Sequence, residues 1–259
     1  MTVNYVVEKH VARVTIDRPE RMNSVDESTW QQLEQTWQKI EQDPDIRVVV
    51  LTGAGERAFC AGADLKAGGD EKTGLEYWES ARPGGFGGLT LRRSLHVPVI
   101  ARVNGVAVGG GFELVLGCDI VIAAENASFG LPEAKVGRMP LDGGMVMLPR
   151  LIPEKIAMGM LLTGRRISPA EAKEYGLVNE VVPPAELDTA VDRWVEQILE
   201  CAPLSIKAIK ESVKQTLDLP PREAQMLRLP ALIVALESDD ADEGPRAFQQ
   251  KRKPKWAGR

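Results

Sequence analysis

The stretch PVIARVNGVAVGGGFEL, residues 98–114, decides the fold. Its first part is an apolar run of the kind that forms a buried strand, and its end begins an apolar helical pattern. Three consecutive glycines, Gly109, Gly110 and Gly111, stand between the two. Glycine permits backbone angles closed to other residues and leaves room beside the main chain. We therefore expect a strand, a tight turn and a helix start here.

The chemistry of this turn depends on the residues after the glycines. The first amides of a helix are unpaired donors that favour negative charge. A phosphate-binding loop would need a Lys and a Ser or Thr after its last glycine, but Phe112 and Glu113 stand there. Amides beside a carboxylate suit a neutral carbonyl that becomes an oxyanion during reaction, with the carboxylate moving a proton. A closely packed turn with a solvated Glu113 is an equally open interpretation.

Composition limits the classes of protein. With 259 residues and 44% hydrophobic content, the chain can bury a core as one large domain, with or without an appendage. A net charge of −5 argues against a nucleic-acid surface. No secretory signal or apolar window of membrane-spanning length appears, so we expect an untargeted cytoplasmic protein and no membrane partner.

The few histidines and cysteines exclude other chemistry. The two histidines lie near no hydrolase motif, which argues against a histidine triad or a zinc site. Cys60, Cys118 and Cys201 are too widely spaced for a metal knuckle and are expected as reduced thiols. We therefore expect no metal, and carboxylates and backbone amides must carry any reaction.

Along the chain, strand, helix and loop patterns alternate before a helical end. Ser24 with Glu27 suggests a capping box for the first helix, and Ser168 with Glu171 suggests another. A glycine-rich segment, residues 67–90, suggests a functional loop or flap. The remaining expected strands are residues 5–8, 11–16, 48–51, 119–124 and 177–182. The remaining expected helices are residues 89–95, 143–150 and 156–162, and the last 60 residues are expected to be helical as well.

A second carboxylate becomes relevant through the order of the elements. Glu113 begins a helix, and Glu133 comes after the next strand, so one strand-helix-strand turn of the fold can bring the two together. Two carboxylates facing one small cavity push their pKa values apart, making one an acid and the other a base. Two surface glutamates are the common alternative for any arbitrary pair.

The chain resembles the crotonase, or enoyl-CoA hydratase/isomerase, superfamily from end to end. The resemblance implies an α/β fold, the crotonase (ClpP-like) spiral of strand-strand-helix units, over residues 1–195. It also implies a helical trimerisation region over residues 196–259, giving a homotrimer or a hexamer made of two trimers. The stretches that carry the resemblance are DRPERMNSV (17–25), AFCAGADLK (58–66), PVIARVNGVAVGGGFEL (98–114), CDIVIAAENASFGLPEAKVG (118–137), LLTGRRISPAEAKEYGLVNEVV (161–182) and EGPRAFQQKRKPKW (243–256).

The resemblance also implies site residues. The oxyanion hole would be made by the backbone amides of Ala63 and Gly110, and the catalytic carboxylates would be Glu113 and Glu133. Residues expected to bind the substrate and its coenzyme A are Lys66, Ala61, Asp64, Leu65, Asp142, Phe248 and Lys251, the last two often across a subunit boundary.

The activity implied is reversible addition of water to a trans-2-enoyl-CoA thioester, with no cofactor besides the coenzyme A of the substrate. ARPGGFGGLT and NASFGLPEAKVG are similar to carnitinyl-CoA dehydratases, and Asp142 with Tyr77, Trp78 or Phe86 would suit a trimethylammonium group. A loop carboxylate beside a packed hydrophobic flap is an equally open interpretation of these residues. In contrast, Ala63 is the form common in general hydratases. An enoyl-CoA isomerase and a noncatalytic binding protein of the same fold are the alternatives.

Overall fold

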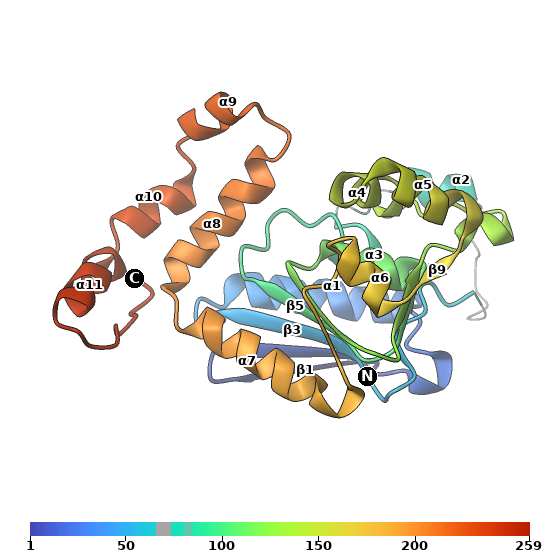
Figure 1. Ribbon diagram of the computed structural model, residues 1–259, viewed down its shortest axis with the longest axis horizontal. Helices are drawn as coiled ribbons and strands as arrows, with labels where there is room; N and C mark the ends of the chain where they lie inside the picture. Colours follow the sequence, from blue (N-terminus) through green and yellow to red (C-terminus); the bar gives the residue numbers. More distant parts are fainter. Residues whose placement is uncertain (66–73, 81, 83) are drawn as a thin grey trace.

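The computed structural model describes residues 1–65, 74–80, 82 and 84–259. A layered α/β body holds most of the chain, and the C-terminal helices project from one end of it (Figure 1). None of the described helices combines the length and apolar character needed to cross a bilayer.

Two sheets organise the body. The larger has the order β1-β2-β3-β5-β7-β10, formed by Val3–Glu8, Val11–Ile16, Val48–Gly53, Val99–Val103, Ile120–Ala124 and Glu180–Val182. The smaller has the order β4-β6-β8-β9, formed by Ala58–Cys60, Val106–Val108, Ser128–Gly130 and Arg166–Ile167. Only β1 with β2 and β8 with β9 pair antiparallel among the described strands.

Successive turns of the chain lay one strand in each sheet. β3 is followed by β4, β5 by β6, and β7 by β8, and the strands of each set lie parallel to one another. Parallel strands are covered on both faces and therefore need continuous apolar runs. Val48 to Leu51 is such a run, and none of its side chains is more than 1% exposed. The expected spiral of strand-strand-helix units is confirmed.

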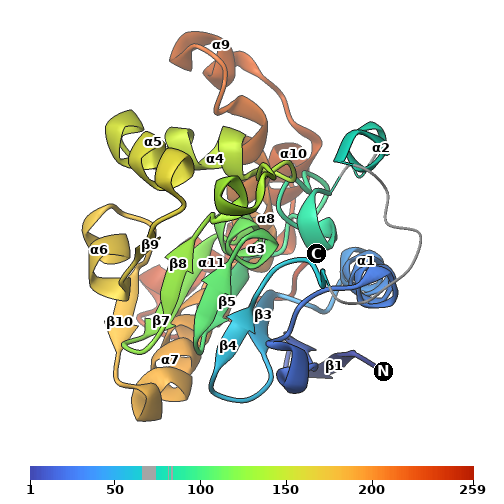
Figure 2. The same cartoon turned by 90° about the vertical axis from the view of Figure 1, so that its right-hand side faces the viewer.

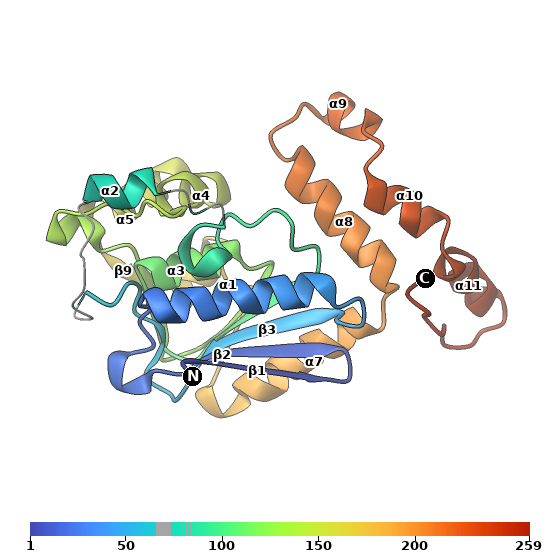
Figure 3. The same ribbon diagram turned by 180° about the vertical axis from the view of Figure 1, so that it is seen from behind.

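Helices cover both faces of the larger sheet. α1 (Glu27–Gln42) lies across one face, as Figure 3 shows, and α3 (Gly110–Gly117) packs into the same apolar core. α7 (Leu187–Leu199) covers the other face through Leu187 and Val191. The short helix η2 (Phe86–Gly88) fits between α1 and α3, where Gly87 O accepts a 2.7 Å hydrogen bond from Trp37 Nε1.

The cap of α1 differs from the expected one. The N-cap is Asp26, whose Oδ1 accepts a 2.8 Å hydrogen bond from Thr29 N, instead of Ser24. Ser24 lies before the helix, where its amide donates to Arg21 O and its backbone carbonyl accepts a bond from Arg18. The second expected capping box is confirmed, because the Ser168 and Glu171 side chains each accept a bond from the other residue's backbone amide.

The rest of the body consists of short helices (Figure 2). They are η1 (Pro19–Arg21), α2 (Gly74–Glu79), η3 (Glu133–Val136), α4 (Gly144–Leu151), α5 (Glu154–Thr163), α6 (Pro169–Glu174) and η4 (Pro184–Glu186). The helix expected over residues 89–95 is wrong, since that segment forms turns. Arg92 holds it in place by ion pairs with Glu34 and Glu41 of α1.

Four helices form the C-terminal arm: α8 (Pro203–Thr216), α9 (Pro221–Met226), α10 (Pro230–Leu236) and α11 (Asp239–Gln249). Lys210 on α8 fastens the arm to the body, 2.6 Å from Asp119 Oδ2 and 2.7 Å from Val97 O. The expected division at residues 195 and 196 falls inside α7, which packs on the sheet and continues to Leu199. The division into two domains stays a prediction.

Candidate active site

The glycine turn before α3 is shaped by its surroundings. Gly109 has a φ of 59°, in the region that favours glycine. A Cβ on Gly111 would lie 1.9 Å from Cys60 O, and one on Gly110 would lie 2.3 Å from the ring of Phe86. Close packing is therefore part of the reason for these glycines. Phe112 N and Glu113 N both donate to Gly109 O, which leaves the amides of Gly110 and Gly111 at the open end of the helix.

The loop after β4 approaches this turn. A Cβ on Gly62 would lie 3.0 Å from Gly110 N, so the two backbones are in contact. Val25 N donates to Gly62 O and Asp64 N donates to Val25 O, which fixes the loop on both sides of Ala63. In this parallel bridge the Ala63 amide points away from Val25. The amides of Ala63 and Gly110 thus come from neighbouring backbone segments that are 47 residues apart in the sequence.

A largely buried ionic network supports the Ala63 loop. One guanidinium nitrogen of Arg18 lies 2.9 Å from both Asp64 Oδ2 and Asp26 Oδ2. The Asp64 side chain is only 5% exposed, so this pairing takes place away from bulk water. Sequence reasoning placed Asp64 in the substrate site; in the structure its carboxylate pairs with Arg18 and holds the loop.

Glu113 lies in the first turn of α3 and is 3% exposed. Its Oε1 accepts a 2.8 Å hydrogen bond from Gly144 N, at the start of α4. Burial raises the pKa of its carboxyl to about 8, and the charges of Asp142 and Glu133 contribute in the same direction. Glu113 is therefore a buried carboxyl that can hold a proton at neutral pH, and the interpretation of a solvated Glu113 is wrong.

Glu133 is the first residue of η3, which follows β8, and it faces the same glycine turn. Its Oε1 lies 3.2 Å from the position that a Cβ on Gly109 would take. Its Oε2 is buried and has no hydrogen-bond partner among the described residues. Burial raises the pKa of this carboxyl as well. The structure therefore places Glu133 beside Gly109 and close enough to Glu113 for its charge to raise the Glu113 pKa, with one Glu133 oxygen unpaired among the residues that the structure describes.

Asp142 adds a third acid to the same region. Tyr77 of α2 donates its hydroxyl to Asp142 Oδ2 in a hydrogen bond. Burial raises the pKa of Asp142, although the Tyr77 hydroxyl and the charge of Arg82 oppose the shift. Burial and the neighbouring carboxylates raise the pKa of Tyr77 far above its ordinary value, so its hydroxyl remains a donor.

The other residues expected around the acyl group are divided. Trp78 is 66% exposed, and Phe86 packs beneath Gly110 instead of offering an open face. Arg82, which the sequence did not single out, lies with its Cζ 4.9 Å from the ring centres of both Tyr77 and Trp30. The signal for Arg82 was weak, because nothing in ARPGG separates a stacked arginine from a solvated one.

The expected coenzyme A residues are spread over the molecule. Ala61 is partly buried, and Leu65 is 67% exposed near the Ala63 loop. Lys66 lies outside the described residues. Phe248, 85% exposed on α11, and Lys251, just after that helix, lie in the arm, away from α3 (Figure 1). Within one chain these two do not join the acids.

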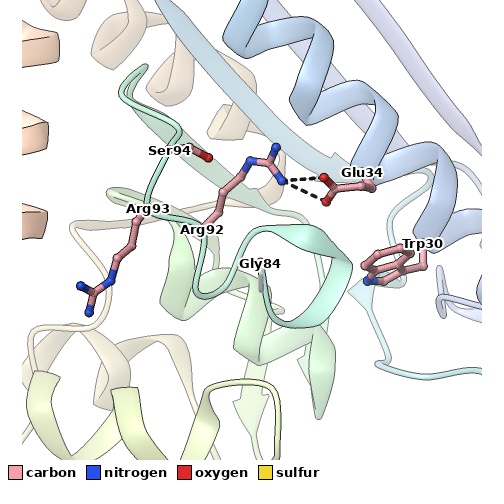
Figure 4. A pocket seen from close by; sticks show the side chains of 6 residues that line it. All are labelled: Trp30, Glu34, Gly84, Arg92, Arg93 and Ser94. Carbon is pink, nitrogen blue, oxygen red and sulfur yellow. Dashed lines mark hydrogen bonds and ion pairs between the residues drawn. The ribbon is translucent and has the colours of Figure 1, made fainter. Parts of the chain in front are cut away.

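Two cavities lie beside this region without including either acid. One, of about 330 Å³, is lined by Trp30, Glu34, Gly84, Arg92, Arg93 and Ser94 (Figure 4). Its Arg92 is already bonded to Glu34, so the cavity belongs to the packing of the loop on α1. The other, of about 770 Å³, lies between α8 and the body, and its lining residues include Leu116, Met147 and Ile209.

Comparison with known proteins decides the family. A family described as Enoyl-CoA hydratase/isomerase matches residues 7–259. The chain belongs to this family. Proteins named carnitinyl-CoA dehydratase from Salmonella paratyphi A and from a strain of Escherichia coli are each 42% identical over 254 residues, covering 96% of this chain and 95% of theirs.

Solved structures of the enoyl-CoA hydratase/isomerase family match the whole fold. An enoyl-CoA hydratase from Bacillus anthracis has a TM-score of 0.92 at 37% identity, with complete coverage of both chains. One from Mycobacterium tuberculosis has a TM-score of 0.89 at 33% identity, covering 100% of this chain and 99% of the other. The chain is thus a hydratase-type lyase of a family that acts on acyl-CoA thioesters, and an isomerase is the less favoured interpretation.

Proposed function

We propose that this enzyme adds water reversibly to short-chain trans-2-enoyl-CoA thioesters, using Glu113 and Glu133 as its acid and base. The observation that carries the proposal is the neighbouring pair of carboxyls, Glu113, which is buried and bonded to Gly144 N, and Glu133, which lies beside Gly109 and has a buried oxygen unpaired among the described residues. A water molecule that bridges two carboxyls needs such an unpaired acceptor. An isomerase, which moves one proton, needs only one of the two acids.

Charge on the thioester oxygen would be stabilised by backbone amides. When water attacks the β-carbon, the double bond shifts and negative charge collects on the thioester oxygen. The amides of Ala63 and Gly110 supply two donors, and the N-terminus of α3 adds its dipole. Each donor contributes on the order of 3 kcal/mol to lowering the barrier.

The two glutamates would exchange the protons of the added water. One carboxylate takes a proton from water as its oxygen bonds to the β-carbon, and the other carboxylic acid gives a proton to the α-carbon. This requires one proton on the pair at the start. The raised pKa values of Glu113 and Glu133 support that state at neutral pH.

The enzyme's other needs arise from this chemistry. General acid–base catalysis with amide donors is sufficient for the reaction, so we propose no cofactor besides the coenzyme A of the substrate. Ala61, Leu65 and Lys66 would line the thioester and pantetheine path, with Asp64 holding that loop. The enzyme would assemble as a homotrimer or hexamer, in which Phe248 and Lys251 bind the nucleotide of a substrate held in a neighbouring subunit. Its location would be the cytoplasm.

A trimethylammonium acyl group is a second candidate substrate, favoured by the names of the 42% identical relatives. Asp142 would be its counter-ion. In the structure that carboxylate is already bonded by Tyr77, which weakens this use of it. The neutral short acyl group therefore remains our first proposal.

Incubation of the purified protein with crotonyl-CoA tests the proposal, with hydration followed as loss of the conjugated thioester absorbance. We expect rapid loss with the wild-type protein and reversal when 3-hydroxybutyryl-CoA is the starting compound. Absence of turnover in both directions would contradict the proposed reaction.

A further inference from the structure

The side chain of Arg82 lies in a box formed by Trp30, Tyr77 and Glu27, which would otherwise suit the cationic group of a ligand. Its Cζ lies 4.9 Å from the ring centres of both Trp30, on α1, and Tyr77, on α2. Its Nη2 lies 3.0 Å from Glu27 Oε2 at the start of α1. Two aromatic faces and a carboxylate are the surroundings in which proteins bind quaternary ammonium groups.

This box is continuous with the acid site. Tyr77 donates its hydroxyl to Asp142, and Asp142 lies two residues before Gly144, whose amide binds Glu113. The side chain of Arg82 is only 18% exposed, so water screens its charge incompletely. A cationic substrate group near Asp142 would be repelled by the Arg82 guanidinium, which already lies against both aromatic rings and the carboxylate.

We infer that Arg82 is a specificity-determining residue, which reserves the acyl end of the site for small uncharged groups and excludes quaternary ammonium groups. A selective site gains as much from a repulsive element against the wrong ligand as from contacts with the right one. Here the guanidinium would act in both ways: it fills the two ring faces, and it repels a second positive charge. The inference rests on the proposed function and names the acyl group that the site takes.

The alternative, that Arg82 only fastens α2 to α1, makes a different prediction. A fastening residue affects all substrates alike, whereas a residue that selects by charge changes the ratio between a cationic and a neutral substrate. The test is therefore a ratio of kcat/KM values for crotonobetainyl-CoA and crotonyl-CoA. These substrates share the reacting thioester and double bond and differ by the trimethylammonium group.

We expect the wild-type ratio of cationic to neutral substrate to lie below one. Arg82→Gln, which removes the charge and keeps a planar polar end, should raise the ratio about tenfold. Arg82→Lys, which keeps the charge and loses the stacked plane, should leave the ratio close to that of the wild type. Arg93→Gln is the matched control, because its guanidinium points away from Trp30 (Figure 4).

An unchanged ratio in Arg82→Gln, or an equal rise in Arg82→Lys, would overturn the inference. A wild-type preference for crotonobetainyl-CoA would overturn the inference as well. That measurement uses only the wild-type protein, so it tests the inference even if Arg82→Gln does not fold. Failure of the wild-type protein on both substrates would contradict the proposed hydration itself. If the wild-type protein hydrates crotonyl-CoA but Arg82→Gln leaves the ratio of cationic to neutral substrate unchanged, only the role of Arg82 is contradicted.

Discussion

At the scale of single residues, the protonation of Glu113 depends on its neighbours. Its pKa is raised to about 8 by burial and by the charges of Asp142 and Glu133. If one proton on the acid pair is required, the rate of hydration falls as the pH rises past about 8, because that proton is lost. Removing a neighbouring negative charge makes this loss easier and moves it to lower pH.

Asp142→Asn should therefore shift the alkaline limb of the kcat/KM profile to lower pH. The amide can still accept from Tyr77, so the change isolates the charge. The profile of crotonyl-CoA hydration between about pH 5 and 10 measures the shift, with the exposed Glu125→Gln as control. An alkaline limb that stays in place or moves to higher pH would show that Asp142 does not act on the pair.

The sequence predicted single residues unevenly. Glu113 and Glu133 could be chosen because family motifs and the order of strands place them on one turn. The amide of Gly144, which binds Glu113, and the ionic role of Asp64 depend on how distant loops fold back. Arg18 meets Asp64 across 46 positions, and no local pattern encodes such a contact.

At the scale of elements, the start of α1 carries the box around Arg82. Both Glu27 and Trp30 belong to the first turns of this helix, so its N-terminal geometry positions the box. Asp26 caps it through Thr29 N and also pairs with Arg18. A well-formed cap of this kind contributes about 1 kcal/mol.

Asp26→Ala should lower the free energy of unfolding by about 1–2 kcal/mol. Ser24→Ala is the informative control, because the sequence pattern favoured Ser24 as the cap and the structure does not. Urea unfolding followed by tryptophan fluorescence measures both. A larger loss for Ser24→Ala than for Asp26→Ala would contradict the observed capping.

Elements with a strong local sequence signal were predicted well. The buried run of β3 and the capped start of α6 have local signals that tertiary packing reinforces. The segment over residues 89–95 has apolar residues that suggest a helix, yet it forms turns, because Arg92 binds two glutamates of α1. Tertiary ion pairs overrode local preference there.

At the scale of the whole molecule, the arm exposes more apolar surface than a monomer requires. Ile209, Val213 and Leu217 on α8 and its C-terminal end are 62%, 54% and 66% exposed, and Phe248 on α11 is 85% exposed. The three α8 residues line the cavity between α8 and the body, and exposed apolar surface of this kind marks an interaction site. The expected trimer would cover it and would bring Phe248 and Lys251 towards a neighbouring site.

Light scattering after size-exclusion chromatography should therefore give three or six times the chain mass of 28.3 kDa. Leu217→Asp, which places a charge on the exposed end of α8, should move the distribution towards smaller species. The control is Glu223→Gln, at an exposed position on α9. Ser212, on α8 itself, is not used for a control because its hydroxyl is buried. A wild-type mass of 28.3 kDa would contradict the assembly.

The central claim, that Glu113 and Glu133 act as a unit on one water molecule, is tested most directly by a double-mutant cycle. The measurement is kcat for crotonyl-CoA hydration by wild type, Glu113→Gln, Glu133→Gln and the double variant. Each single change should lower kcat by about 10²–10⁴, and the double variant should be little worse than either, because one acid is of no use without the other. A wild-type rate in Glu133→Gln, or losses that simply multiply, would contradict the account.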